Sequence, residues 1–354
     1  MELTEKKGFL ARKNVVFSLQ RYLVDALGAM ALGLFASLIV GRILLTAGEQ
    51  LTTLMGANAF FTFLEQIGTT AMGLMGPAIG VAVAYGLGAP PLVLFASVIT
   101  GAAGAAAGAD GITAGPAGAF VGAVIGAEFG KLISRETKVD ILVTPAVTIA
   151  TGIMAANFIG PIVAGFMRGL GAVIMSATEL APLPMGVLVA VLMGLALTAP
   201  ISSAALAIMM TLSGPAAGAA TVGCAAQMIG FAVASYRENG WGGLISQGMG
   251  TSMLQIPNIV KHPLILIPPT LAAALIGPLS TTVFRMENIP AGAGMGTSGF
   301  VGPLLTLQTM GFTYPVFGAV LLLHFILPAV LTLLFSEWMR KKGLIKLGDY
   351  NLDL

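Results

Sequence analysis

Residues 180–236 read LAPLPMGVLVAVLMGLALTAPISSAALAIMMTLSGPAAGAATVGCAAQMIGFAVASY and contain no Asp, Glu, Lys or Arg. A helix crosses a bilayer with about 20 apolar residues, so this run holds more than one crossing. Two further charge-free runs, 66–109 and 288–336, also exceed that length. The whole chain is 56% hydrophobic and 9% charged, with a mean hydropathy of +0.94, whereas a soluble domain carries about 25% charged residues. These features predict an all-α polytopic membrane protein.

Apolar runs bounded by charges and by Pro or Gly breaks predict about ten spanning helices inside one membrane-embedded domain, residues 22–338. The predicted spans are 22–46, 66–87, 91–109, 114–134, 140–158, 162–179, 185–211, 214–235, 263–283 and 314–338. Two other apolar segments, 240–258 and 289–310, are too rich in glycine and too broken to be ordinary spans. Non-helical backbone survives at membrane depth only where it lines a polar cavity or is buried in protein. We therefore expect two re-entrant hairpins.

Lysine and arginine gather at the N-terminus, in the 131–138 loop, at 237–261 and at 340–346. The positive-inside rule places all four regions, and hence both termini, in the cytoplasm. Residues 1–21 carry no apolar core typical of a cleavable signal. Residues 8–22 are expected to form either an amphipathic helix on the membrane surface or an untethered basic tail. Residues 339–354 are expected to be a cytoplasmic tail.

Several functional classes find no support in the sequence. The chain has no phosphate-binding P-loop and no HExxH motif, and its two histidines lie far apart. The single cysteine, Cys224, lies in an apolar run, so no disulfide framework or cysteine metal cluster is expected. Basic residues are not gathered into a patch with aromatics. We expect no metal, no cofactor and no nucleic-acid partner.

Neutral polar side chains gather at three breaks between apolar segments. Polar groups at membrane depth are costly unless they are paired or hydrated, so they are candidates for binding a ligand. Hydroxyls and amides suit a polyhydroxylated, sugar-like solute, which needs many donors and acceptors and no countercharge. Alternatively, each hydroxyl bonds back to its own helix. The candidates are Gly250, Thr251, Ser252, Gln255, Pro257 and Asn258; Pro200, Ser202 and Ser203; and Gly294, Thr297 and Ser298.

Four ionisable residues lie in or at the ends of apolar segments: Asp110, Glu128, Glu179 and Arg168. Each is a candidate for proton coupling or for ion pairing. Asp110, in GADGITAGP, is alternatively expected to cap the following helix.

The order of motifs resembles the membrane-embedded IIC components of the bacterial phosphotransferase system, above all the fructose-type branch and stand-alone IIC-like proteins of the PfoR type. The resemblance covers roughly residues 100–310. It rests on AGPAGAFVGAVIGAEFGKLI (114–133), KVDILVTP (138–145), APISSAALAIM (199–209), ENGWGGLISQGMGTSMLQIPNIVKHPLILIP (238–268) and IPAGAGMGTSGFVG (289–302).

This resemblance implies a sugar permease of the bacterial cytoplasmic membrane, a homodimer, and separate IIA and IIB proteins that supply phosphate. Three positions depart from the family pattern. Aligned on Ile256-Pro257, Met253 stands where the family has an acidic residue that binds the accepting sugar hydroxyl, Ser203 stands where it has a lysine, and 289–302 contains no histidine. A methionine cannot orient or deprotonate a hydroxyl, so phosphotransferase activity stays open.

Three functional hypotheses follow. The first is a permease that binds and translocates a small polar solute. The second is a membrane sensor or regulator whose bound ligand is read by a cytoplasmic partner through the basic N-terminal segment. The third is a secondary transporter that couples solute to protons without phosphorylation.

Overall fold

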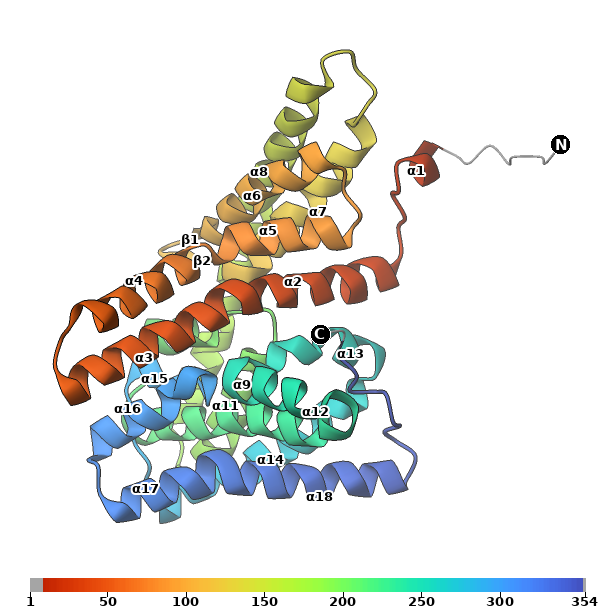
Figure 1. Ribbon diagram of the computed structural model, residues 1–354. Helices are drawn as coiled ribbons and strands as arrows, with labels where there is room; N and C mark the ends of the chain where they lie inside the picture. The colour runs from red at the N-terminus through yellow and green to blue at the C-terminus, as the bar shows by residue number, and fades with distance from the viewer. Residues whose placement is uncertain (1–8, 353–354) are drawn as a thin grey trace. The chain divides into compact units, whose positions relative to one another are not determined.

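The computed structural model describes residues 9–352 and is almost entirely helical (Figure 1). The chain divides into two compact units. Unit 1 comprises residues 9–34 and Leu74–Ala164, and unit 2 comprises Phe35–Gly73 and residues 165–352. Two long helices, Arg21–Thr53 and Asp140–Thr178, continue from one unit into the other.

Unit 1 is a group of helices joined by short turns and one small hairpin. Its elements are α1 (Phe9–Arg12), the π-helix η1 (Arg21–Ala26), α2 (Leu27–Leu34), α5 (Met75–Gly86), α6 (Pro91–Ala106), β1 (Gly108–Ala109), β2 (Ile112–Thr113), α7 (Gly115–Ile133) and the first part of α8 (Asp140–Thr178). The helix α6 packs between α5 and α7, and α2 packs on α5. Small residues allow this: a Cβ added at Gly104 would overlap the carbonyl of Gly118.

Unit 2 begins with η2 (Phe35–Ile39), α3 (Val40–Met55) and α4 (Ala59–Gly73) and resumes with the end of α8. Then follow α9 (Pro182–Thr198), α10 (Ser203–Met209), α11 (Gly214–Ala234), α12 (Tyr236–Ile245), η3 (Ser246–Gly250), η4 (Ser252–Gln255), α13 (Ile256–Lys261), η5 (Pro263–Leu266), α14 (Ile267–Pro278), η6 (Leu279–Val283), α15 (Pro290–Ala293), η7 (Ser298–Phe300), α16 (Val301–Met310), α17 (Tyr314–Leu321), η8 (Leu322–Ile326) and α18 (Leu327–Lys341).

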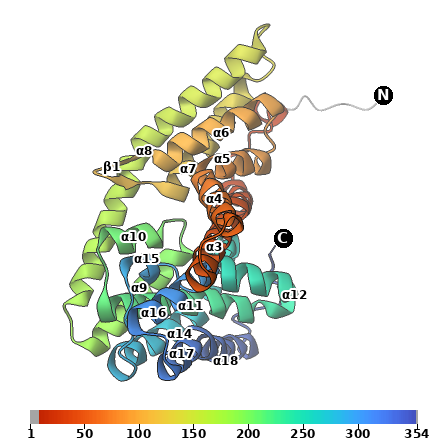
Figure 2. The same cartoon turned by 60° about the vertical axis from the view of Figure 1, so that its left-hand side comes forward.

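The helix α11 is the centre of unit 2. Nearly all of its side chains are buried, and it packs against α9, α14 and α18. Its composition of Gly, Ala and Thr lets its neighbours approach to backbone contact, since a Cβ added at Gly223 would overlap the carbonyl of Ala190 on α9. Around this helix lie the shorter, broken elements, with α10 beside α15 (Figure 2).

The prediction of an all-α polytopic membrane protein is confirmed. Among the described residues, six helices are long and apolar enough to cross a bilayer, or seven if α4 and α5 count as one span. The two shorter apolar helices α6 and α9 also coincide with predicted spans. The number of ten crossings and the re-entrant hairpins remain predictions.

Four predicted spans, 140–158, 162–179, 185–211 and 66–87, differ in detail from the helices. The predicted break near Pro161 is absent, because α8 runs unbroken from Asp140 to Thr178 with Pro145 and Pro161 inside it. Proline is tolerated in membrane helices where neighbouring groups satisfy the freed carbonyl. By contrast, Pro200 does end a helix, so 185–211 becomes α9 and α10. The predicted span 66–87 is divided at Leu74 between α4 and α5.

The continuous amphipathic helix expected over residues 8–22 is wrong for the described part, residues 9–22. The helix α1 ends at Arg12, Asn14 has a left-handed φ of 55°, and residues 15–18 are not helical. The untethered tail is wrong there too. Lys13 Nζ donates to the Ser134 carbonyl (2.5 Å), and Arg21 Nη2 donates to the Leu87 carbonyl (2.5 Å). These long-range bonds tie the segment to unit 1.

Candidate functional site

The first of the two broken segments runs from α12 to α13. Gly240 interrupts α12 with φ 55°, and Thr251 is fully extended between η3 and η4. Thr251 Oγ1 accepts a hydrogen bond from the Met253 backbone N–H (3.2 Å), which starts η4. A Cβ at Gly250 would press on the ring of Phe35. Glycine at that position therefore lets the break lie against η2.

The second broken segment runs from α15 to α16. Left-handed φ values at Gly296 (51°), Gly299 (52°) and Phe300 (58°) break the helical path. Asn288 holds both ends of this segment: its Nδ2 donates to Thr306 Oγ1 (3.0 Å), to the Gly302 carbonyl (3.2 Å) and to Thr221 Oγ1 of α11 (2.8 Å). The segment is thus anchored to the central helix of unit 2.

The three predicted polar clusters meet in unit 2. Thr297 Oγ1 donates to the Gly248 carbonyl (2.6 Å), which joins the two broken segments. Ser203 Oγ, at the start of α10, donates to the Gly294 carbonyl (2.7 Å). Ser252 Oγ lies 2.8 Å from Thr198 Oγ1 at the end of α9. The result is a buried, uncharged group of hydroxyls and main-chain carbonyls drawn from four parts of the chain.

The remaining predicted residues occupy different places around this group. Ser202 caps α10, because its Oγ accepts from the Ala205 backbone N–H (3.1 Å), and half-buried Pro200 lies in the turn before it. Ser298 is buried at the start of η7, and half-buried Pro257 lies in the first turn of α13.

Gln255 and Asn258 form a ladder of side-chain amides. Asn258 Nδ2 donates to Gln255 Oε1 (2.8 Å), and Gln255 Nε2 donates to Gln247 Oε1 (2.9 Å). Gln247 Nε2 continues the ladder to Ser235 Oγ (2.8 Å) at the end of α11. Both predicted residues also donate to main-chain carbonyls of the C-terminal segment, Gln255 to Tyr350 (3.1 Å) and Asn258 to Asn351 (2.7 Å).

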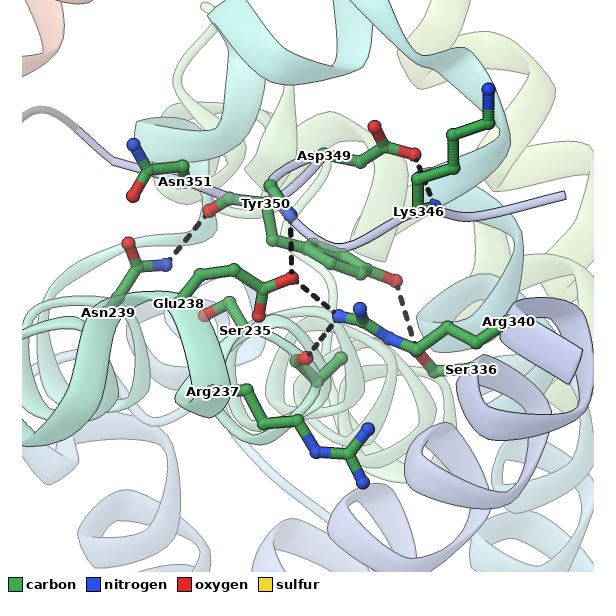
Figure 3. A network of polar contacts seen from close by, with 12 residues as sticks. Ser235, Arg237, Glu238, Asn239, Ser336, Arg340, Lys346, Asp349, Tyr350 and Asn351 are labelled. Carbon is green, nitrogen blue, oxygen red and sulfur yellow. Dashed lines mark hydrogen bonds and ion pairs between the residues drawn. The ribbon is translucent and has the colours of Figure 1, made fainter. Parts of the chain in front are cut away.

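The C-terminal segment carries a second polar network next to this ladder (Figure 3). Arg340 Nη2 donates to Glu238 Oε1 (2.7 Å) and to the Ala234 carbonyl (3.2 Å). The Arg340 guanidinium also lies over the Tyr350 ring, 5.2 Å from its centroid. Burial raises the pKa of Tyr350 to about 12. The described part of the predicted cytoplasmic tail, residues 339–352, is therefore folded against unit 2.

Unit 1 has an ionic cluster of its own around two residues of α7. Lys131, only 1% exposed, donates through Nζ to Glu128 Oε1 (2.9 Å) and to the carbonyls of Asn14 (2.8 Å) and Leu87 (3.1 Å). Arg21 Nε lies 3.9 Å from Glu128 Oε1. Glu128 is therefore ion-paired in this structure, which is one of the two roles expected for it.

The other ionisable candidates lie apart from that cluster. Asp110 and Gly111 form the turn of the β1–β2 hairpin with left-handed φ values of 54° and 78°. The expectation that Asp110 caps the following helix is wrong, because the N-cap of α7 is Ala114. Asp-Gly is the preferred pair for this two-residue turn. Arg168 lies inside α8, and Glu179 directly follows it.

The chain matches the family model for the phosphotransferase system, EIIC, over residues 24–352. It belongs to the phosphotransferase-system EIIC family. No curated protein and no solved structure matches it. EIIC domains are membrane permease components that work with separate IIA and IIB proteins and a transported solute.

In this EIIC protein, several polar residues of the buried groups were not among the sequence candidates: Thr198, Gln227, Gln247, Thr270 and Asn288. The side-chain amide of Gln227 links two threonines: its Oε1 accepts from Thr198 Oγ1 (3.4 Å), and its Nε2 donates to Thr270 Oγ1 (2.9 Å). The side-chain amide of Gln227, inside the charge-free run 180–236, marks it as a candidate site residue, because such groups are rare at membrane depth. Gln247 lies inside the first glycine-rich segment and Asn288 directly precedes the second, so the same signal applies to both.

An open hollow of about 440 Å³ lies elsewhere in unit 2. It is lined mainly by methionine, leucine, proline and small polar side chains between the end of α8 and the start of α11. None of the predicted binding residues lines it, and its hydroxyl side chains are those of Thr178, Thr211 and Ser213.

Proposed function

We propose that this EIIC protein binds a small polar solute, a sugar, and carries it across the bacterial cytoplasmic membrane as a homodimer. We place it with the fructose-type branch and the stand-alone PfoR-type proteins. The observation that carries the proposal is the meeting of three neutral polar clusters through the Thr297–Gly248, Ser203–Gly294 and Thr198–Ser252 contacts. A sugar needs many donors and acceptors and no countercharge, and this group supplies both kinds without a charged residue.

The solute contacts are proposed at the two breaks, Gly250–Ser252 and Gly294–Ser298, with Gln255, Pro257 and Asn258 beyond the first break and with Pro200, Ser202 and Ser203 on a third side. Thr251 is extended, and its backbone N–H closes η3 by donating to the Ser246 carbonyl (3.0 Å). Its hydroxyl accepts from the Met253 backbone N–H and keeps a proton to donate. We propose that both broken segments are re-entrant, and that both termini are cytoplasmic. The basic segment after α11 and the C-terminal segment contact each other, which supports their lying on one side.

Phosphorylation by this chain itself is not part of the proposal. Met253 is 5% exposed and offers a thioether where the family resemblance implies a carboxylate. A thioether can accept only weak hydrogen bonds and cannot deprotonate the sugar hydroxyl that would accept phosphate. We propose that translocation proceeds without phosphoryl transfer, and that any contact with IIA or IIB proteins serves another purpose.

Uptake by purified protein in liposomes tests this function. A panel of radiolabelled hexoses and hexitols is supplied outside, without IIA, IIB or phosphoenolpyruvate, and the internal product is separated by anion-exchange chromatography. At least one sugar should accumulate to equilibrium in unphosphorylated form. Thr251→Ala should lower its uptake about tenfold, the loss of a hydrogen bond to a ligand. Thr309→Ala, an exposed residue bonded only to its own helix, is the matched control.

Each other result points to a different function. Binding of a sugar without flux would favour the sensor. Uptake that requires a pH gradient and loses this requirement in Asp110→Asn would favour proton coupling. Absence of both binding and uptake across the panel would overturn the proposal.

A further inference from the structure

The C-terminal segment is built into unit 2 through the side chain of Tyr350. The residue is fully buried, in a cluster with Phe231, Ile265 and Met339. Its ring meets Phe231 edge-on, with centroids 6.2 Å apart, and its hydroxyl lies 3.4 Å from Ser336 Oγ. Tyrosine side chains in well-packed, desolvated pockets are among the residues that contribute most to binding at protein interfaces.

The residues flanking this anchor are bound through their main chain. Asn239 Nδ2 donates to the Tyr350 carbonyl (2.8 Å), and Asn239 Oδ1 accepts from the Leu352 backbone N–H (2.8 Å). Glu238 Oε1 accepts from the Gly348 backbone N–H (3.3 Å). Figure 3 shows Glu238 and Asn239 lined up along the segment. Together with the donors of Gln255 and Asn258, these contacts make a cradle for the main chain of residues 348–352, which enters it through a turn with Gly348 at φ 100°.

Two residues of this cradle are also predicted solute contacts. A side-chain amide nitrogen has two N–H groups. In Gln255 they serve Gln247 Oε1 and the Tyr350 carbonyl, and in Asn258 they serve Gln255 Oε1 and the Asn351 carbonyl. While the C-terminal segment is docked, neither amide nitrogen has an N–H left for a sugar hydroxyl.

We propose that Glu238, Asn239, Gln255 and Asn258 form a peptide-docking site occupied by residues 348–352 of the same chain, and that this peptide and the solute compete for the amide donors of Gln255 and Asn258. The inference rests on the proposed function. When only the undocked fraction of the protein is competent, the apparent solute affinity falls by that fraction. Release of the segment therefore strengthens solute binding, and fixing it in place weakens binding.

A reversible cross-link in the full-length chain tests the competition. His262 and Asp349 flank the cradle, with Nδ1 and Oδ1 3.7 Å apart, and neither is a proposed solute contact. His262→Cys together with Asp349→Cys is joined by a bismaleimide that contains a cleavable disulfide. Cys224 is fully buried and does not react. Equilibrium binding is measured with labelled D-fructose and with the sugar that gives the highest uptake in the liposome panel.

We expect the cross-linked protein to bind the sugar about tenfold more weakly than the same protein after reduction of the linker. Each single-cysteine variant, treated with the same reagent, should bind like the untreated protein. Equal affinity before and after reduction would overturn the competition while leaving the proposed function intact. If no sugar binds to the reduced form either, the proposed function fails and the competition fails with it.

A pair of substitutions in the anchor gives an independent measurement. Tyr350→Ala empties the pocket and should loosen the segment, raising sugar affinity severalfold. Tyr350→Phe keeps the ring and loses only the contact with Ser336, so its affinity should stay near that of the unmodified chain. Weaker sugar binding by Tyr350→Ala, with monodispersity retained, would show that the segment supports the site and would overturn the inference.

Discussion

Lys131 shows how a charged side chain is accommodated inside this protein. Its ammonium group, withdrawn from water, is surrounded by one carboxylate and two main-chain carbonyls. Taking such a charge out of water is affordable only when hydrogen bonds replace its hydration. Two of these acceptors belong to Asn14 and Leu87, so the cation also fixes the N-terminal segment and the loop after α5 within unit 1.

Replacing Lys131 should therefore destabilise unit 1. Lys131→Met removes one donor from Glu128 and from the Asn14 and Leu87 carbonyls, which then keep mainly their contacts with Arg21. We expect a loss of up to about 3–5 kcal/mol, the usual effect of breaking a buried ion pair from one side. The measurement is thermal unfolding in detergent. Lys138→Met, at an exposed loop position, should leave the unfolding temperature unchanged. Combining Lys131→Met with Glu128→Gln should recover part of the loss; simple additivity of the two changes would contradict a direct pair.

The phenol of Tyr350 should titrate far above the ordinary range. Burial raises its pKa from 10.0 to about 12, so docking of the neutral phenol contributes stability that is complete below pH 10. That contribution is lost as the pH rises from 10 towards 12. Tyrosinate absorbance of the unmodified chain minus that of Tyr350→Phe should reveal a transition near pH 12, before which the segment stays docked. A transition near pH 10 would mean that Tyr350 is exposed in solution.

At the scale of elements, helix contacts in unit 2 depend on glycine at points of closest approach. Between α9 and α14, a Cβ at Gly186 would overlap the backbone of Gly277, and between α9 and α11 a Cβ at Gly223 would overlap Ala190. Membrane helices gain stability from such close packing, because lipid provides no hydrophobic force between them. The central helix α11 is buried on nearly all sides, so it cannot shift away from a neighbour without moving into another helix.

Gly223→Ala should accordingly separate α11 from α9. Inserting one methyl group into a full interface costs about 1–3 kcal/mol, and here the obstacle is backbone. We expect a clear drop in the unfolding temperature of the purified protein. Gly169→Ala in α8 adds the same methyl group where no atom lies within 4 Å, and it should be neutral or slightly stabilising. Equal effects of both substitutions would refute the close approach.

The elements also show what hydrophobic pattern predicts and what it misses. Long apolar runs led to α7, α11 and α18, since length and composition suffice to define a spanning helix. Proline had the opposite effect to the predicted one at two positions. The predicted span 185–211 runs through Pro200, but α9 ends before it at Thr198, whereas the predicted break near Pro161 is absent and α8 continues through it. The difference depends on tertiary neighbours, which a local pattern does not contain. By contrast, the Asp110-Gly111 pair is a local sequence signal for a two-residue hairpin turn, and it predicts the β1–β2 hairpin better than it predicts a helix cap.

For the whole molecule, the sequence could predict where neutral polar residues occur but not how they pair. Thr297, Ser203 and Ser252 were each identified from their apolar surroundings, and their partners turned out to be Gly248, Gly294 and Thr198. Main-chain carbonyls have no side-chain signature, so contacts to them cannot be predicted from sequence. For the same reason nothing in the sequence indicated that Gln255 and Asn258 bind the backbone of residues 350 and 351.

The hydrogen bond from Thr297 to the Gly248 carbonyl has a consequence for motion inside unit 2. Each broken segment consists of short helical pieces separated by non-helical residues, and such pieces open more easily than a continuous helix. Here the opening of either one exposes an unpaired buried group on the other. The two segments should therefore fluctuate as one cooperative element, opening together or staying closed together.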